Sequence, residues 1–146
     1  MVKNFLFKIA NEHNFNLKTI PLEQSNFLRN DLYRKYKVEN RGLFLWDSYI
    51  PNSYLSNRED SWLGLDDFIQ SKETIIFFDQ KVEANFFELL SGQSIVSLLE
   101  NYKHDEYYLT NRNLDFLICC TDLGHLVAAG TARDWLEKQD LAVSSG

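Results

Sequence analysis

The spacing of apolar and polar residues divides the first part of the chain into helical and extended segments. Apolar side chains recur every three or four positions over residues 2–13, which predicts a helix. Residues 17–20 are expected to be extended, since residues before a proline avoid the helical region. Pro21 suits a first helical turn, so a second helix is predicted after it. Its expected apolar face consists of Phe27, Leu28, Leu32, Tyr33 and Tyr36.

A long polar segment separates two predicted strands in the middle of the chain. The strands are expected at residues 43–46 and 74–78, and the second is apolar enough to be buried on both faces. Residues 47–62 have no clear period and are predicted to form a long loop, a kind of segment that often carries function. One or two helical turns are expected over residues 63–69. The pattern over residues 84–90 fits a strand or a helix, and its paired phenylalanines favour the strand.

The last third of the chain has the clearest pattern. A helix carrying Ile95 and Leu98 is predicted to precede three extended runs, which are separated by short turns and are therefore expected to be antiparallel neighbours. Thr131 is expected to cap a final helix over about residues 131–139, with Asp134 completing a capping box. The predicted class is α+β: an antiparallel sheet with a C-terminal three-stranded meander, and helices at the N-terminus, before the meander and at the C-terminus. The three runs are residues 106–110, 114–120 and 125–129.

Length and composition indicate a single domain with a substantial core. The chain has 146 residues, 45% of them hydrophobic, and residues 144–146 are treated as a tail outside the fold. No apolar run approaches the roughly 20 residues that cross a membrane, and the start does not resemble a signal peptide. We therefore expect a cytoplasmic protein that does not contact a membrane. Cys119 and Cys120 are adjacent and would point to opposite faces of a strand, so no disulfide between them is expected.

The charge distribution favours a protein partner over a nucleic acid. The net charge is −6, but residues 1–40 carry +3 and residues 41–146 carry −9. An acidic body repels phosphate backbones, whereas it attracts a basic protein and speeds their encounter. The alternative is that the charge serves solubility alone.

Motifs for catalysis and for cofactor binding are missing from the sequence. It contains no glycine-rich phosphate loop, no Gly-x-Ser-x-Gly turn and no His-Glu-x-x-His zinc motif. Cys119, Cys120, Asp122 and His125 are the only cluster of candidate ligands, and adjacent strand cysteines cannot converge on one metal ion. We therefore expect no metal, no cofactor and no catalytic residue. A nucleophile pair of Cys120 and His125 remains as an alternative interpretation, in which the protein is an enzyme.

The segment over residues 47–73 is the best candidate for a binding surface. It holds six acidic residues against two basic ones and is dotted with aromatic side chains, a combination typical of interaction surfaces. The alternative is that its tryptophan belongs to the core and its acids are merely solvated. The residues predicted to bind a partner are Asp47, Tyr49, Tyr54, Glu59, Asp60, Trp62, Asp66 and Asp67.

Residues 106–136 resemble small bacterial toxin-immunity proteins, such as those of polymorphic-toxin and contact-dependent inhibition systems. The resemblance implies a protein that binds a cognate toxin and occludes its active site without catalysis, and it transfers no individual binding residue. The alternative is a small cytosolic adaptor that binds another cellular protein. The residues that carry the resemblance are Glu106-Tyr107-Tyr108-Leu109-Thr110, Asp115-Phe116-Leu117-Ile118-Cys119, His125, Gly130 and Trp135.

Overall fold

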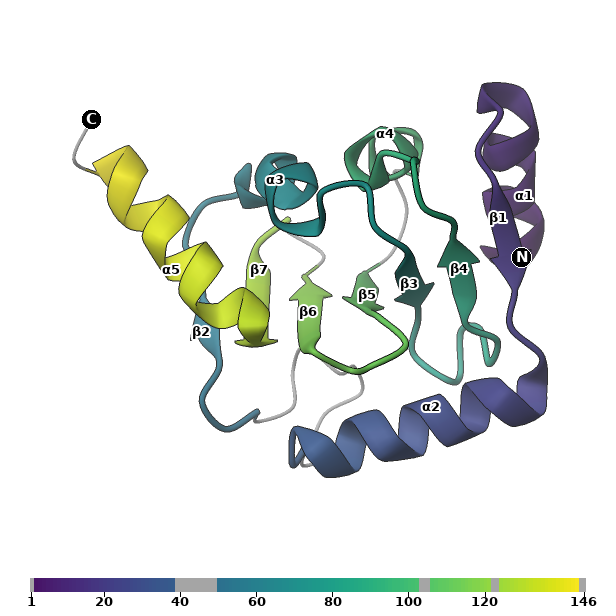
Figure 1. Ribbon diagram of the computed structural model, residues 1–146, viewed down its shortest axis with the longest axis horizontal. Helices are drawn as coiled ribbons and strands as arrows, with labels where there is room; N and C mark the ends of the chain where they lie inside the picture. The colour runs from purple at the N-terminus through teal and green to yellow at the C-terminus, as the bar shows by residue number, and fades with distance from the viewer. Residues whose placement is uncertain (1, 39–49, 103–105, 122–123, 145–146) are drawn as a thin grey trace.

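The computed structural model describes residues 2–38, 50–102, 106–121 and 124–144 (Figure 1). The predicted strand at 43–46 and the first residues of the predicted loop lie outside these ranges. Helices and strands alternate irregularly along the chain, as expected of an α+β protein. In chain order the elements are α1 (Val2–His13), β1 (Leu17–Thr19), α2 (Leu22–Lys35), β2 (Tyr54–Leu55), the 3₁₀ helix η2 (Ser61–Gly64), α3 (Leu65–Ile69), β3 (Thr74–Phe77), β4 (Phe87–Leu89), α4 (Ile95–Asn101), β5 (Tyr107–Thr110), β6 (Phe116–Cys120), β7 (Leu126–Gly130) and α5 (Thr131–Ser144).

All seven described strands form one antiparallel sheet in the order β1-β4-β3-β5-β6-β7-β2. The predicted α+β class and the β5-β6-β7 meander are confirmed. Residues 84–90, whose pattern fitted either a strand or a helix, contain strand β4. The paired phenylalanines of this segment had favoured the strand. No helix within the described ranges is long and apolar enough to cross a membrane.

Helices cover the sheet on both faces. One hydrophobic core lies between the sheet and helices α1, α3, α4 and α5, and a second lies between the opposite face and α2 (Figure 1). Neighbouring strand residues alternate between the two cores: buried Cys119 belongs to the second core and buried Cys120 to the first. Both thiols are free, as the alternation predicted.

Two sequence-based predictions about residues 1–73 need correction. Residues 47–62 do not form a loop throughout, because they contain strand β2 and the start of η2; a two-residue strand is too short to give a periodic pattern. Phe27 does not lie on the buried face of α2 and is 62% exposed. The buried positions of α2 are Ser25, Arg29 and Leu32, and Phe27 points about 200° around the helix from either of the first two.

The final helix also differs from its prediction. It continues to Ser144, five residues beyond the expected end and into the supposed tail. Thr131 is the first helical residue, and its backbone N–H donates to the Asp115 carbonyl oxygen over 2.9 Å. Among the described contacts, Asp134 bonds to Arg133, so the predicted capping box does not form. Trp135 packs against the first core, as expected.

Gly130, at the junction of β7 and α5, provides a test of this packing. Its φ is +70°, and a Cβ atom there would collide with the backbone of Asp115 and lie 2.9 Å from the Cα of Phe116. We expect Gly130→Ala to lower the free energy of unfolding by roughly 3 kcal/mol, because backbone strain and overpacking add. Gly92→Ala is the matched control: φ is +85° there, but the space is open, so roughly 1 kcal/mol is expected. Urea denaturation measures both, and equal losses would contradict this account of Gly130.

Candidate functional site

The described residues of the predicted binding surface lie on one continuous stretch from the sheet edge to α3. Tyr54 is in β2, Glu59 and Asp60 lie between β2 and η2, and the others are in η2 and α3. Asp47 and Tyr49 lie outside the described residues. The remaining two acids and the tryptophan are Asp66, Asp67 and Trp62.

The members of this stretch differ in what they contact. Glu59 and Asp67 are exposed, as a partner-binding role requires. Trp62 is half-buried against the first core. Asp66 accepts hydrogen bonds from Ser94 Oγ at 2.6 Å and from the Val96 backbone N–H at 3.2 Å, so it holds the start of α4. The fold itself therefore uses Trp62 and Asp66.

A carboxylate on α5 fixes the edge strand β2. Asp140 accepts hydrogen bonds from Tyr54 Oη at 2.8 Å and from Ser56 Oγ at 3.0 Å. The hydrogen bond to Asp140 raises the pKa of the Tyr54 phenol, and burial and the charges of Asp140 and Glu137 add to this shift. The phenol thus stays protonated and keeps donating. Because the Asp140 side chain is only 13% exposed, these bonds are shielded from water.

Arg58 joins the fixed edge to the acids that follow it. Its Nη2 atom lies 2.8 Å from Asp60 Oδ1, and its Nη1 atom lies 3.7 Å from Asp140 Oδ1. Its backbone N–H also donates to Ser56 Oγ over 3.2 Å. Arg58 is thereby neutralised within the fold, whereas Glu59 is exposed and has no ion-pair partner among the described residues.

Sequence reasoning missed Asp140 and Ser56. The predicted helix ended near residue 139, one position before the carboxylate. A signal was nevertheless present: Asp140 follows buried Ala132 and Leu136 at intervals of four residues, on the same face of the helix. A carboxylate in line with core residues indicates a polar partner on the neighbouring element.

The residues of the enzyme interpretation bond to backbone carbonyls. His125 Nδ1 lies 3.0 Å from the carbonyl oxygen of Ser56, which can only accept, so Nδ1 carries the proton in this contact. The Cys120 thiol contacts the Thr121 carbonyl oxygen at 3.6 Å. Burial raises the pKa of Cys120 to about 11 and also raises that of Cys119. The thiol form of both cysteines is therefore favoured at neutral pH.

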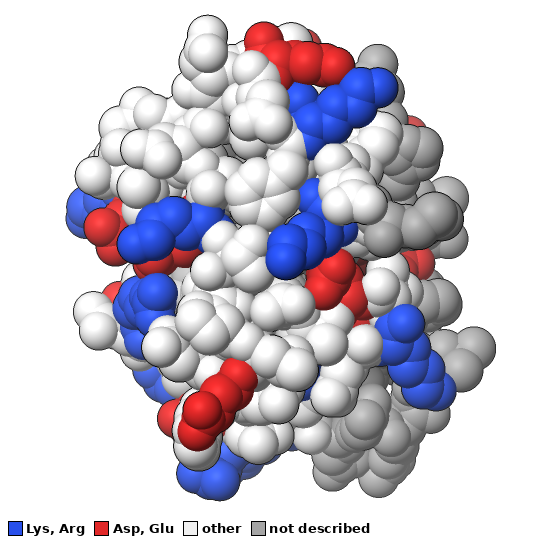
Figure 2. Space-filling view, turned by 90° about the vertical axis from the view of Figure 1, so that its right-hand side faces the viewer, with Lys and Arg blue, Asp and Glu red and all other residues white. Residues whose placement is uncertain are grey.

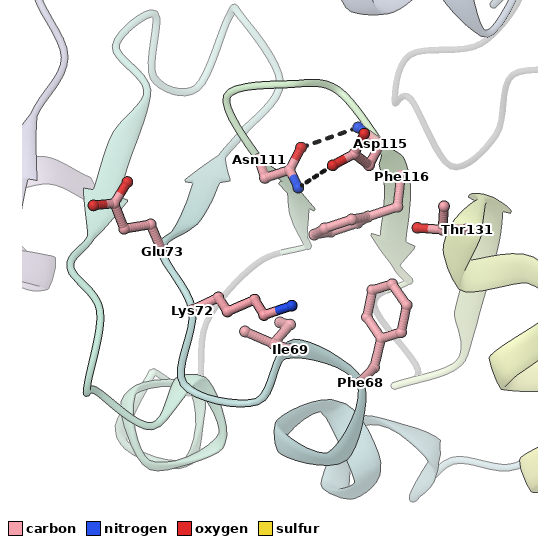
Figure 3. Close-up of a pocket in the computed structure, with 8 residues that line it drawn as sticks. All are labelled: Phe68, Ile69, Lys72, Glu73, Asn111, Asp115, Phe116 and Thr131. Carbon is pink, nitrogen blue, oxygen red and sulfur yellow. Dashed lines mark hydrogen bonds between the residues drawn. The ribbon is translucent and has the colours of Figure 1, made fainter.

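A small cavity lies between α3, the β5–β6 turn and the start of α5 (Figure 3). Its volume is about 200 Å³, and Phe68 and Phe116 form an apolar wall. The amino group of Lys72 points into it, whereas Glu73 points away (Figure 3). Asp115 is held by Asn111, whose Nδ2 donates to it over 2.9 Å. The charged side chains of Lys72 and Asp115 thus both line the cavity, and the described groups do not converge on a reacting centre.

Comparison of the chain with protein-family models, with curated proteins and with solved structures finds no match. Among the described residues, no group of three or more histidine, cysteine, aspartate or glutamate side chains could hold a metal ion. The geometry of the β2 edge is therefore the main structural guide to function.

Removing the Asp140 carboxylate should loosen this edge. We expect Asp140→Ala to lower the free energy of unfolding by about 2–3 kcal/mol, since Tyr54 and Ser56 lose their acceptor and Arg58 loses a counter-charge. Asp134→Ala on the same helix is the control, because that side chain is 77% exposed and a change within about 0.5 kcal/mol is expected. Thermal or urea unfolding measures both. A neutral effect of Asp140→Ala would show that the network does not stabilise the edge.

The cysteines should be unreactive in the folded protein. With a pKa of about 11, only about one Cys120 side chain in a thousand is a thiolate at pH 8, and the residue is 5% exposed. We expect negligible modification by a chromogenic disulfide reagent at pH 8 in native protein, and two modified thiols per chain after denaturation in urea. Rapid native labelling of Cys120, abolished by His125→Ala in a folded variant, would instead support the enzyme interpretation.

Proposed function

We propose that this chain is a non-catalytic binding protein, and specifically an immunity protein that occludes the active site of a cognate bacterial toxin. The observation that carries the proposal is the acidic stretch beside an edge strand that is held in place by half-buried hydrogen bonds. A rigid, exposed surface loses little conformational entropy on binding, so it favours stoichiometric association. The resemblance of residues 106–136 to toxin-immunity proteins supports the same class.

The charge of the surface supports a basic partner. Residues 50–73 carry five acids against two basic residues, and one of those two, Arg58, is paired within the fold. Toxins that cleave nucleic acids need basic clefts to hold phosphates, so an acidic cover can compete for such a cleft. By contrast, the side of the molecule formed by α1 and β1 shows lysine and arginine interspersed with acids (Figure 2).

The proposal also includes a cytoplasmic location, where an immunity protein would meet a toxin that has entered the cell. Two free, buried cysteines suit a reducing compartment. The proposal requires neither a nucleic acid nor a membrane as a partner.

Co-expression with the products of neighbouring genes tests the proposal. We expect one product to be toxic alone, harmless with this chain, and bound to it in a stoichiometric complex. Binding to a non-toxic cellular protein instead would favour an adaptor. Turnover of a substrate without complex formation would contradict both interpretations.

Charge reversal on the acidic stretch tests the surface itself. In the variant Glu59→Lys/Asp60→Lys/Asp67→Lys, association with the co-purified partner should slow by about tenfold at low salt and lose most of its salt dependence. The matched control reverses three exposed acids of α1 and α2 and changes the net charge equally. Similar slowing in both variants would mean that overall charge, and not this surface, guides encounter. The control variant is Glu12→Lys/Glu23→Lys/Asp31→Lys.

A further inference from the structure

The hydrogen-bonding pattern between β2 and β7 shows which backbone groups of β2 point out of the sheet. Ser56 N–H donates to the Leu126 carbonyl oxygen at 2.9 Å, and Tyr54 pairs with Ala128 in the same register. In an antiparallel ladder, pairs that exchange hydrogen bonds alternate with pairs that do not. The N–H and C=O of Leu55, between them, therefore point away from β7.

Leu55, the second of the two residues of β2, lies at a sheet edge that no other described strand covers. No described strand follows β2 in the sheet, and within the described residues the Leu55 backbone makes no hydrogen bond. Its side chain is 54% exposed. Ser53 and Asn57 lie two positions from Leu55, outside the two-residue strand β2. Unpaired backbone groups beside an exposed apolar side chain form a template for another strand.

The opposite edge of the sheet lacks this combination. The central residue of strand β1 is the exposed Lys18, and a charged side chain on an edge strand discourages pairing with another chain. Lysine and arginine side chains are visible over this side of the molecule (Figure 2). At the β2 edge the exposed residue of the strand is Leu55.

We propose that the β2 edge binds an extended segment of a basic protein partner, which adds a strand to the sheet beside residues 53–57. This inference rests on the proposed function and specifies how the partner binds. The added strand would exchange main-chain hydrogen bonds with Leu55, as in other cases of β-strand addition. The Tyr54–Asp140 and Ser56–Asp140 hydrogen bonds hold the accepting strand in its bound conformation.

The side chains around β2 indicate the sequence of the added strand. Tyr54 lies on the α5 face of the sheet, where the charges of Asp140 and Glu137 act on it. Leu55 lies on the opposite face, because side chains alternate along a strand. Residues of the partner on the α5 face should therefore be basic, and those beside Leu55 should be apolar. Glu59 and Asp60 extend the acidic surroundings beyond the end of the strand.

The test uses a synthetic strand with this pattern, acetyl-Lys-Val-Lys-Val-Lys-Val-Lys-amide, added to the ¹⁵N-labelled full chain. We expect the amide resonances of residues 53–57 to shift, and the Leu55 amide to exchange more slowly with solvent. The same peptide with glutamate in place of lysine is the charge control and should bind at least about tenfold more weakly. Shifts centred elsewhere, or absent at millimolar peptide, would overturn the proposal.

Two variants separate the backbone of Leu55 from its side chain. Leu55→Pro removes the leucine side chain and an outward N–H that no described residue uses, so the fold should persist while peptide affinity falls at least about tenfold. Leu55→Ala keeps the N–H and should lose no more than about threefold. Equal affinities for both variants would exclude strand addition. If Leu55→Pro does not fold, slowed exchange of the Leu55 amide in the unaltered chain decides the question.

Two further outcomes separate this inference from the proposed function. Concentration-dependent shifts at Leu55 without peptide would identify a second copy of the chain as the occupant and overturn the inference. A co-purified toxin that binds without protecting the Leu55 amide would refute strand addition but leave toxin neutralisation intact. Peptide binding at β2 in the absence of any toxic gene product would support strand addition and contradict toxin neutralisation.

Discussion

Burial of the sheet on both faces is the constraint on which the rest of the structure depends. Every residue of β3, β5 and β6 is buried, so each strand must be covered from two sides. Short connections keep successive strands antiparallel, while helices between other strands and at both ends of the chain supply the two cover layers. Among the described strands, β1 and β2 at the two margins of the sheet each pair with one neighbour alone.

The second core depends on polar contacts as well as apolar packing. Its cover, α2, buries Ser25 and Arg29 besides Leu32. Ser25 Oγ donates to the Ile20 carbonyl and accepts from the Phe86 N–H, and Arg29 donates to the Phe78 carbonyl over 3.0 Å. The guanidinium also lies over the Phe86 ring, 4.9 Å from its centroid. These contacts set the position of the helix over the strand ends, which apolar packing alone would leave less specific.

Local pattern predicted most of the fold, because burial on one or two faces leaves a trace in short stretches of sequence. The meander around Cys119 and the strand at 74–78 followed from apolar runs between turn residues. Strand β2 could not be predicted in this way, since its two residues are defined by pairing with distant β7. The exposure of Phe27 also escaped local reasoning, because a polar Arg29 occupies the core side of the helix instead.

The location of the binding surface stays a prediction, and the organisation of this segment could not be predicted from the sequence. The acidic bias of residues 47–73 identified the segment, yet the carboxylate that holds it, Asp140, comes from a helix more than sixty residues away. Composition cannot distinguish an acid that the fold uses from one that it leaves free. Asp66 and Asp140 accept half-buried hydrogen bonds, whereas Glu59 and Asp67 are exposed.

This division of the acids constrains how such a surface can change. A residue such as Asp140 contributes to stability and to the local negative potential at once, so its substitution affects both. Glu59 and Asp67 contribute to the potential without internal partners among the described residues, and exposed positions of this kind tolerate substitution at little cost in stability. A binding surface built on a rigid edge strand with free acids beside it can therefore alter its specificity while the network beneath it stays unchanged.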